Sequence, residues 1–181
     1  MRTSTAAVGV IATALTFAAT AAPASAAAPK LSTQDVKYLQ TSAAGDLFEI
    51  QFGKIAISKG QLQTTRSYAA RLVKDHTKSL ADARTIAKAY SISLPSKPLP
   101  DMREVIAKVS KNRGLAFDVK YLQSEVTDHY GDIAAGLKEF ERGANPRIKA
   151  NAAQDLPVLR YHLWRGGLDA RYALWVQGRS R

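Results

Sequence analysis

Three histidines are the residues best suited to chemistry in this chain, and each falls on the apolar stripe of a different expected helix. They are His76, His129 and His162. About three positions in seven of a helix face a core, so three unrelated histidines would all do so roughly one time in twelve. Each histidine also lies near the middle of its expected helix, which would bring the three rings to one level of a bundle. Neutral imidazole is the commonest protein ligand for zinc, iron and copper. The pattern therefore predicts one ion of these transition metals in the core.

A carboxylate would complete this ligand set, and three acidic residues are candidates. Glu49 lies at the edge of the stripe in its helix and is the first choice. The hexapeptide DVKYLQ occurs twice, at an offset of 83 residues, which indicates a duplicated hairpin. In that register Asp132 corresponds to Glu49, and Asp46 corresponds to His129. One of the three carboxylates is expected to bind the ion or to orient an imidazole.

A second interpretation of the histidines stays open at this point. Each could be an ordinary core residue that hydrogen-bonds a backbone carbonyl or a neighbouring Asp or Tyr. Asp75 and Asp128 directly precede two of the histidines, so they are expected to point off the core-facing side into solvent.

Apolar residues recur at three- and four-residue spacing along four segments, with no strand-like alternation, and this predicts an all-α fold. The expected helices span 32–60, 62–90, 115–142 and 146–176. Residues 91–113 include three prolines in six positions and are expected to form a long crossover with one short helix. Short connections join the first two and the last two helices. The order therefore predicts a ferritin-like four-helix bundle made of two antiparallel hairpins.

Several residues predict details of these helices. Gly60 is expected to end the first helix in the left-handed conformation. Pro157 is expected to bend the last helix, and the pair Gly166-Gly167 to interrupt it. The core-facing stripe expected in the first helix consists of Val36, Leu39, Ala43, Leu47, Ile50 and Ile57.

The N-terminus has the pattern of a cleaved export signal. Arg2 is followed by an uncharged, Ala-rich stretch at 6–19 and by small-residue cleavage sites at 24–26. Residues 1–26 are therefore expected to be a signal peptide, and residues 27–181 a single helical-bundle domain. The chain has no cysteine, which excludes a lipoprotein anchor, disulfides and thiolate metal sites. We expect a secreted protein, extracellular, periplasmic or associated with the cell envelope, with no transmembrane segment after cleavage.

The mature chain is strongly basic, because loss of Arg2 lowers the formal net charge only from +11 to +10. Such a charge favours anionic partners. We expect anionic envelope polymers or a membrane surface, and no specific nucleic acid. The aromatic and basic tail at 168–181 is the expected contact region, and the sequence does not determine the oligomeric state.

Several short motifs resemble the bacterial family catalogued as domain of unknown function 4142, which comprises exported ferritin-like proteins often labelled outer-membrane proteins. The motifs are LFEIQFGK at 47–54, VKDHTK at 73–78, DH at 128–129, LPVL at 156–159 and HL at 162–163. The resemblance implies a ferritin-like bundle and places His76, His129, His162 and Glu49 at the family's polar core positions. It implies no activity. Gln51 departs from the family by replacing a second carboxylate, and the tail at 164–181 departs from it as well.

The motifs of common enzymes are absent from the sequence, so a conventional enzyme is not favoured. A di-iron site in a bundle would use Glu-x-x-His on two helices, but Val73 and Leu159 occupy the positions three residues before His76 and His162. There is also no G-x-S-x-G elbow, no cysteine nucleophile and no glycine-rich phosphate loop. The sequence favours an exported metal-binding bundle. The alternative is a non-catalytic envelope scaffold that acts through its basic surface and aromatic tail.

Overall fold

The computed structural model describes residues 30–180, and every regular element in that part of the chain is a helix. The expected signal peptide, residues 1–26, lies outside the described residues. The helices are α1 (Thr33–Lys59), α2 (Gln63–Ala89), α3 (Pro100–Ser110), α4 (Gly114–Arg142) and α5 (Pro146–Arg179). The prediction of an all-α fold is confirmed.

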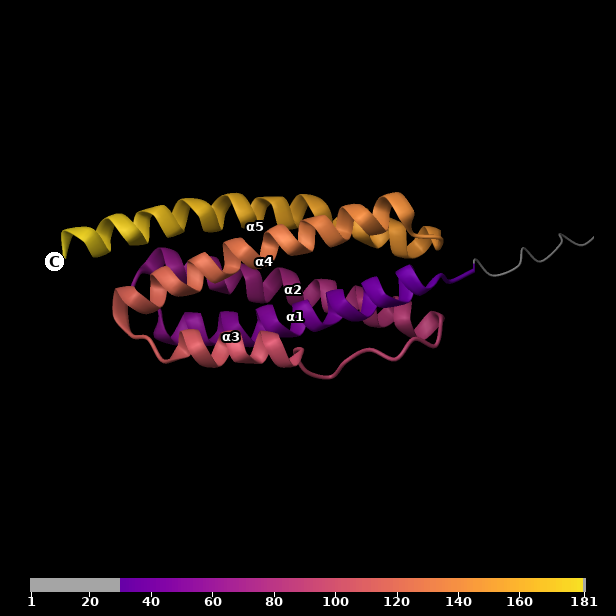
Figure 1. Ribbon diagram of the computed structural model, residues 1–181, viewed down its shortest axis with the longest axis horizontal. Helices are drawn as coiled ribbons and strands as arrows, with labels where there is room; N and C mark the ends of the chain where they lie inside the picture. Colours follow the sequence, from indigo (N-terminus) through magenta and orange to yellow (C-terminus); the bar gives the residue numbers. More distant parts are fainter. Residues whose placement is uncertain (1–29, 181) are drawn as a thin grey trace, which may run out of the picture.

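The four long helices form two antiparallel hairpins, α1 with α2 and α4 with α5 (Figure 1). Between the hairpins, α1 packs against α4 and α2 packs against α5. The crossover runs along the bundle and carries α3, which contacts α1 and α4. The predicted ferritin-like arrangement, two hairpins with a long crossover and a short helix, is therefore confirmed.

The duplicated hexapeptide explains how the two hairpins are held together. Asp35, in the first turn of α1, accepts hydrogen bonds at Oδ1 from the backbone N–H groups of Ala144 (2.9 Å) and Asn145 (3.0 Å), in the turn between α4 and α5. Its Oδ2 accepts from the backbone N–H of Ser32 at 2.6 Å, completing the capping box. One carboxylate thus caps its own helix and the turn of the other hairpin.

Asp118 holds the corresponding position in the second copy of the hexapeptide. Its Oδ2 accepts hydrogen bonds from the N–H groups of Gln61 (3.1 Å) and Leu62 (3.3 Å), in the turn between α1 and α2. Each hairpin therefore binds the turn of the other through the same residue type at the same place. The two copies of the hexapeptide therefore make equivalent contacts between the hairpins.

Replacing Asp35 is expected to destabilise the fold more than replacing Asp118. Asp35→Asn loses an acceptor because both oxygens of Asp35 accept hydrogen bonds, whereas Asp118→Asn keeps the amide oxygen for Gln61 and Leu62. We expect a loss of about 2–4 kcal/mol in the free energy of unfolding for Asp35→Asn and about 1 kcal/mol for Asp118→Asn. Urea denaturation measures both, with the exposed Asp101→Asn as the control. Equal losses at the two positions would contradict the geometry.

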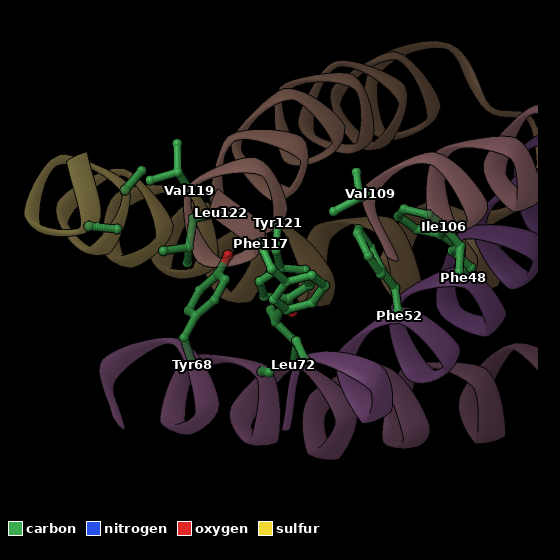
Figure 2. Packing of buried hydrophobic residues seen from close by; sticks show 14 residues of the cluster. Phe48, Phe52, Tyr68, Leu72, Ile106, Val109, Phe117, Val119, Tyr121 and Leu122 are labelled. Carbon is green, nitrogen blue, oxygen red and sulfur yellow. The ribbon is translucent and has the colours of Figure 1, made fainter. Parts of the chain in front are cut away.

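Two apolar clusters fill opposite ends of the bundle and leave a polar band between them. The larger cluster lies near the α1–α2 turn and includes Phe48, Phe52, Tyr68, Leu72, Phe117, Tyr121 and Leu122 (Figure 2). The smaller cluster lies at the other end and includes Tyr38, Leu39, Ile86, Ile148 and Ala152. The buried polar residues of the band are Asp46, Glu49, His76, Glu125, His129 and His162.

The stripe predicted for the first helix is only partly the buried face of α1. Leu39 and Ala43 are buried, but Ile57 is 38% exposed. Asp46 and Glu49 lie on the buried face instead. An apolar periodicity misplaces this face because it counts carboxylates as surface residues.

Gly60 ends α1 as expected, but the left-handed conformation expected for Gly60 and the interruption expected at Gly166-Gly167 were wrong, and close packing gives the reason. Gly60 has φ −57° and ψ 128°, so it is not left-handed; a Cβ there would lie 2.8 Å from the carbonyl oxygen of Ala56. The pair Gly166-Gly167 does not interrupt α5, which continues to Arg179. Gly166 leaves room for Tyr68, since a Cβ would lie 2.7 Å from the tyrosine hydroxyl. That hydroxyl donates a hydrogen bond to the carbonyl of His162 at 3.1 Å.

Candidate metal centre

The three histidines meet in the polar band, each from a different helix. His76 comes from α2, His129 from α4 and His162 from α5. The ring centroids lie 5.8 Å apart for His76–His129, 5.4 Å for His76–His162 and 5.2 Å for His129–His162. One nitrogen from each ring belongs to a set whose members all lie within 4.8 Å of one another. The structure therefore brings the three histidines into one cluster of possible ligands.

One nitrogen of each ring is fixed by a hydrogen-bond acceptor outside the cluster. Nδ1 of His129 lies 2.8 Å from the carbonyl oxygen of Glu125, which can only accept, so this nitrogen carries hydrogen. Nδ1 of His76 donates to Asp46 at 2.9 Å, and Nε2 of His162 donates to Asp75 at 2.9 Å. These acceptors fix the tautomer and the direction of each ring, as outer-shell partners do in histidine metal sites.

The other nitrogen of each ring, called here the inward nitrogen, has no hydrogen-bond donor beside it. Nε2 of His129 lies 3.2 Å from Nδ1 of His162, and Nε2 of His76 is buried with no hydrogen-bond partner among residues 30–180. In neutral rings all three inward atoms are lone pairs. Two lone pairs at 3.2 Å repel each other unless a proton or a cation lies between them. A proton or a cation between these two nitrogens would remove the repulsion.

The pKa values show which ring of the cluster is protonated most readily. Burial, and then the charge of His76, lower the pKa of His129 to about 3 and that of His162 to about 4. Burial also opposes the charged form of His76, but the hydrogen bond and charge of Asp46 outweigh it and raise the pKa of His76. Near neutral pH His129 and His162 are thus neutral imidazoles, and His76 is the ring whose protonation its surroundings favour.

A pair of carboxyl groups lies on the other side of the His129 ring. Glu49 of α1 and Glu125 of α4 are both fully buried. One oxygen of each lies within 4.8 Å of the other and of a His129 nitrogen, and Oε1 of Glu49 is 3.8 Å from Nδ1 of His129. Among the described residues, no lysine or arginine forms an ion pair with either group, and their oxygens have no hydrogen bond of good geometry. Burial, followed for Glu49 by the charge of Glu125, raises the pKa of both carboxyl groups.

The other predicted carboxylates have different places. Asp46 orients His76, as described above, and burial raises the pKa of Asp46. Asp132 lies beside Gly45 of α1, and burial, then the charge of Asp128, raises the pKa of Asp132 to about 7. Glu49 groups with Glu125 and His129 rather than with all three histidines.

The expectation that Asp75 and Asp128 are solvated was wrong. Asp75 accepts from His162 and also pairs with Arg71, and these hydrogen bonds lower the pKa of Asp75 although burial opposes the shift. Asp128 is half-buried, and burial raises its pKa. Both lie at helix interfaces, because a bundle helix that contacts two neighbours buries more than one narrow stripe.

A cavity of about 360 Å³ connects the cluster with the surface. His76 and His162 lie on its wall, together with Asp46, Asp132 and Asp155. Its rim includes the exposed residues Lys37, Thr41 and Lys78. The cavity therefore reaches two of the three histidines, and carboxyl groups line it.

A sequence model described as domain of unknown function (DUF4142) matches residues 20–166. The chain belongs to the DUF4142 family. The match includes all three histidines and the carboxylates around them, and it ends before the last turns of α5. The crystal structure of a DUF305 fragment from Deinococcus radiodurans is similar to this DUF4142 protein, with a TM-score of 0.69, 16% sequence identity, and coverage of 79% of this chain and 99% of that chain. At this identity the similarity concerns the fold, and it supports the ferritin-like helical arrangement.

Glu125 was not predicted as a site residue, although the sequence contains a signal for it. It lies four residues before His129, so both side chains share one face of α4. The three-residue Glu-x-x-His spacing of di-iron proteins does not include this pair. A carboxylate four residues from a histidine on an apolar stripe is thus the pattern that identifies Glu125.

Proposed function

We propose that this DUF4142 protein binds one first-row transition-metal ion through the inward nitrogens of His76, His129 and His162. The observation that carries the proposal is the convergence of three lone pairs whose rings are fixed from behind by Asp46, Asp75 and the Glu125 carbonyl. An uncharged set of three imidazoles suits zinc, copper or iron.

The buried carboxyl groups Glu49 and Glu125 would balance the charge of the ion. A dication bound next to His129 favours the ionised form of both groups, so metal binding releases protons from them. The proposal thereby accounts for two buried acids that lack a basic partner among the described residues.

The setting that we propose is outside the cytoplasm, as a secreted or envelope-associated protein. The support for export is the sequence of residues 1–26, with a basic start, an apolar stretch and small-residue cleavage sites. Sequestration, transport or sensing of a metal ion would each use the same centre. None of these functions needs a substrate to be transformed.

The direct test is elemental analysis of untagged residues 27–181 purified without chelators, beside the double variant His76→Ala/His129→Ala. We expect about one ion per chain in the wild type and none in the double variant, because one imidazole is too few donors for tight binding. Asp82→Asn, which changes an exposed carboxylate on α2, is the matched control and should retain the ion.

The double variant leaves a cavity, so circular dichroism must show that it folds. If it does not fold, Asp75→Asn serves instead, since it leaves all three rings in place and replaces the carboxylate that holds His162 and Arg71 with a neutral amide. A wild-type protein that contains no metal and gains none from added zinc, copper or iron would overturn the proposal. The histidines would then be core residues that share a proton.

A further inference from the structure

Five large apolar side chains form an exposed stripe on α5. They are Tyr161, Trp164, Leu168, Tyr172 and Trp175, and between 38% and 60% of each is exposed. Their spacings of three, four, four and three residues place them on one face of the helix. The opposite face packs on the bundle through Ala170 and Ala173. The stripe extends for about 21 Å along the helix.

The charges around this stripe are positive. Arg160, Arg171 and Arg179 are exposed on the same helix. The guanidinium of Arg179 lies 4.9 Å from the ring centroid of Trp175. The acidic residue of this segment, Asp169, is buried and paired with Arg165 at 2.8 Å. The surface therefore combines aromatic side chains with cations that have no carboxylate to neutralise them on this segment.

The position of the stripe makes it accessible to a large, flat partner. The last turns of α5 project past the end of the other helices (Figure 1), and the family match ends at residue 166, before them. No described helix is long and apolar enough to cross a membrane. The stripe is thus suited to lying on a surface rather than to spanning a bilayer.

We propose that this face of α5 lies at the surface of an anionic bilayer. Tryptophan and tyrosine favour the boundary between headgroups and acyl chains, and each arginine near an anionic surface adds about 1 kcal/mol of attraction. A hydrated anionic polymer would attract the arginines but offers no apolar phase for the aromatic rings. A second copy of the chain would bring like charges together, which disfavours dimerisation through this face.

The two tryptophans of the chain, Trp164 and Trp175, both belong to the stripe. Their fluorescence therefore reports on this face alone. We expect a blue shift when residues 27–181 are mixed with phosphatidylcholine vesicles that contain phosphatidylglycerol, together with co-sedimentation. Vesicles of phosphatidylcholine alone should bind at least about tenfold more weakly, because the arginines lose their attraction.

The variant Leu168→Ser/Tyr172→Ser removes two apolar side chains and keeps both tryptophans. It should bind the anionic vesicles about tenfold or more weakly. Leu174→Ser is the matched control: Leu174 is also exposed on α5, but it lies roughly 200° around the helix from Tyr172. It should bind like the wild type.

Equal effects of Leu168→Ser/Tyr172→Ser and Leu174→Ser would overturn the proposal. So would binding to vesicles without a blue shift, or tighter binding to a soluble anionic polysaccharide than to the vesicles, since these would indicate charge attraction alone. Concentration-dependent dimerisation that is lost in Leu168→Ser/Tyr172→Ser would also overturn it, in favour of a second copy. The proposal is independent of the metal centre, so wild-type protein with and without added zinc should bind the vesicles equally.

Discussion

Zinc is expected to raise the free energy of unfolding of the metal-free protein by about 4 kcal/mol when free zinc exceeds its dissociation constant a thousandfold. The reason is that the folded chain presents three oriented imidazoles, whereas the unfolded chain presents them separately. Thermal or urea unfolding with and without zinc measures the gain. His76→Ala/His129→Ala should show no gain, and an equal gain in that variant would contradict the site.

This gain should increase with pH, because a proton on the inward nitrogen of His76 competes with the ion. The pKa of His76 is raised by Asp46 against the effect of burial. In the metal-free protein that shift stabilises the fold at low pH, and the contribution is lost as pH rises through the pKa of the folded state. Zinc binding has the opposite dependence: it is weakest below that pKa and reaches its full strength above it.

The acceptors behind the rings should also matter for affinity. Asp46→Asn and Asp75→Asn are expected to weaken zinc binding by about 10- to 100-fold, since a neutral amide holds the N–H of each ring less strongly than a carboxylate does. The exposed Asp82→Asn should leave the affinity unchanged. Isothermal titration at constant pH measures all three variants.

Glu125→Gln is expected to stabilise the metal-free protein at alkaline pH by about 5 kcal/mol. Burial raises the pKa of Glu125 from its usual 4.5 to about 8. The folded state therefore retains a proton that the unfolded state has lost. Stability due to this group is fully present below about pH 4.5 and is lost as pH rises through 8, at about 1.4 kcal/mol per pH unit. Glutamine has the same shape and stays neutral, so the variant avoids this loss.

Urea denaturation of chelator-treated protein at pH 5 and pH 8.5 measures this difference. The wild type and Glu125→Gln should be similar at pH 5 and should diverge at pH 8.5. Glu141→Gln, which changes an exposed residue of α4, is the control and should follow the wild type. Equal stability of Glu125→Gln and wild type at pH 8.5 would show that the carboxyl group is not buried as a neutral acid.

Metal should reverse the effect of Glu125→Gln. A bound dication favours ionised carboxylates next to it, so the zinc-loaded wild type should lose little stability between pH 5 and pH 8.5. The zinc-loaded variant lacks one of the two compensating charges and should bind zinc more weakly. The opposite effects on the metal-free and metal-loaded forms distinguish a charge-balancing role from a purely structural one.

The helices and the positions of the three histidines could be predicted from the sequence because their signals are local. Three- and four-residue spacing of apolar residues predicts where a helix lies, and proline-rich segments show where it cannot continue. A histidine within such a stripe faces the core whatever the neighbouring helix is, so His76, His129 and His162 could be placed before their partners were known. The duplicated hexapeptide also predicted two related hairpins, although not the reciprocal caps made by Asp35 and Asp118.

The partners of the histidines were decided by the tertiary structure. Asp75 seemed to point into solvent when α2 was considered alone, but α5 packs there and supplies His162, 87 residues away in the sequence. Glu125 looks like a surface residue to any scale of apolarity, and the apolar stripe placed Glu49 only at its edge, yet both are buried where α1 and α4 meet. Whether a carboxyl group is buried depends on which second helix covers it and on which hydrogen-bond partners that helix supplies. Such information resides in long-range packing, so the sequence alone placed the three histidines in the core, and only the folded bundle determined which acceptors orient their rings and which carboxyl groups are buried beside them.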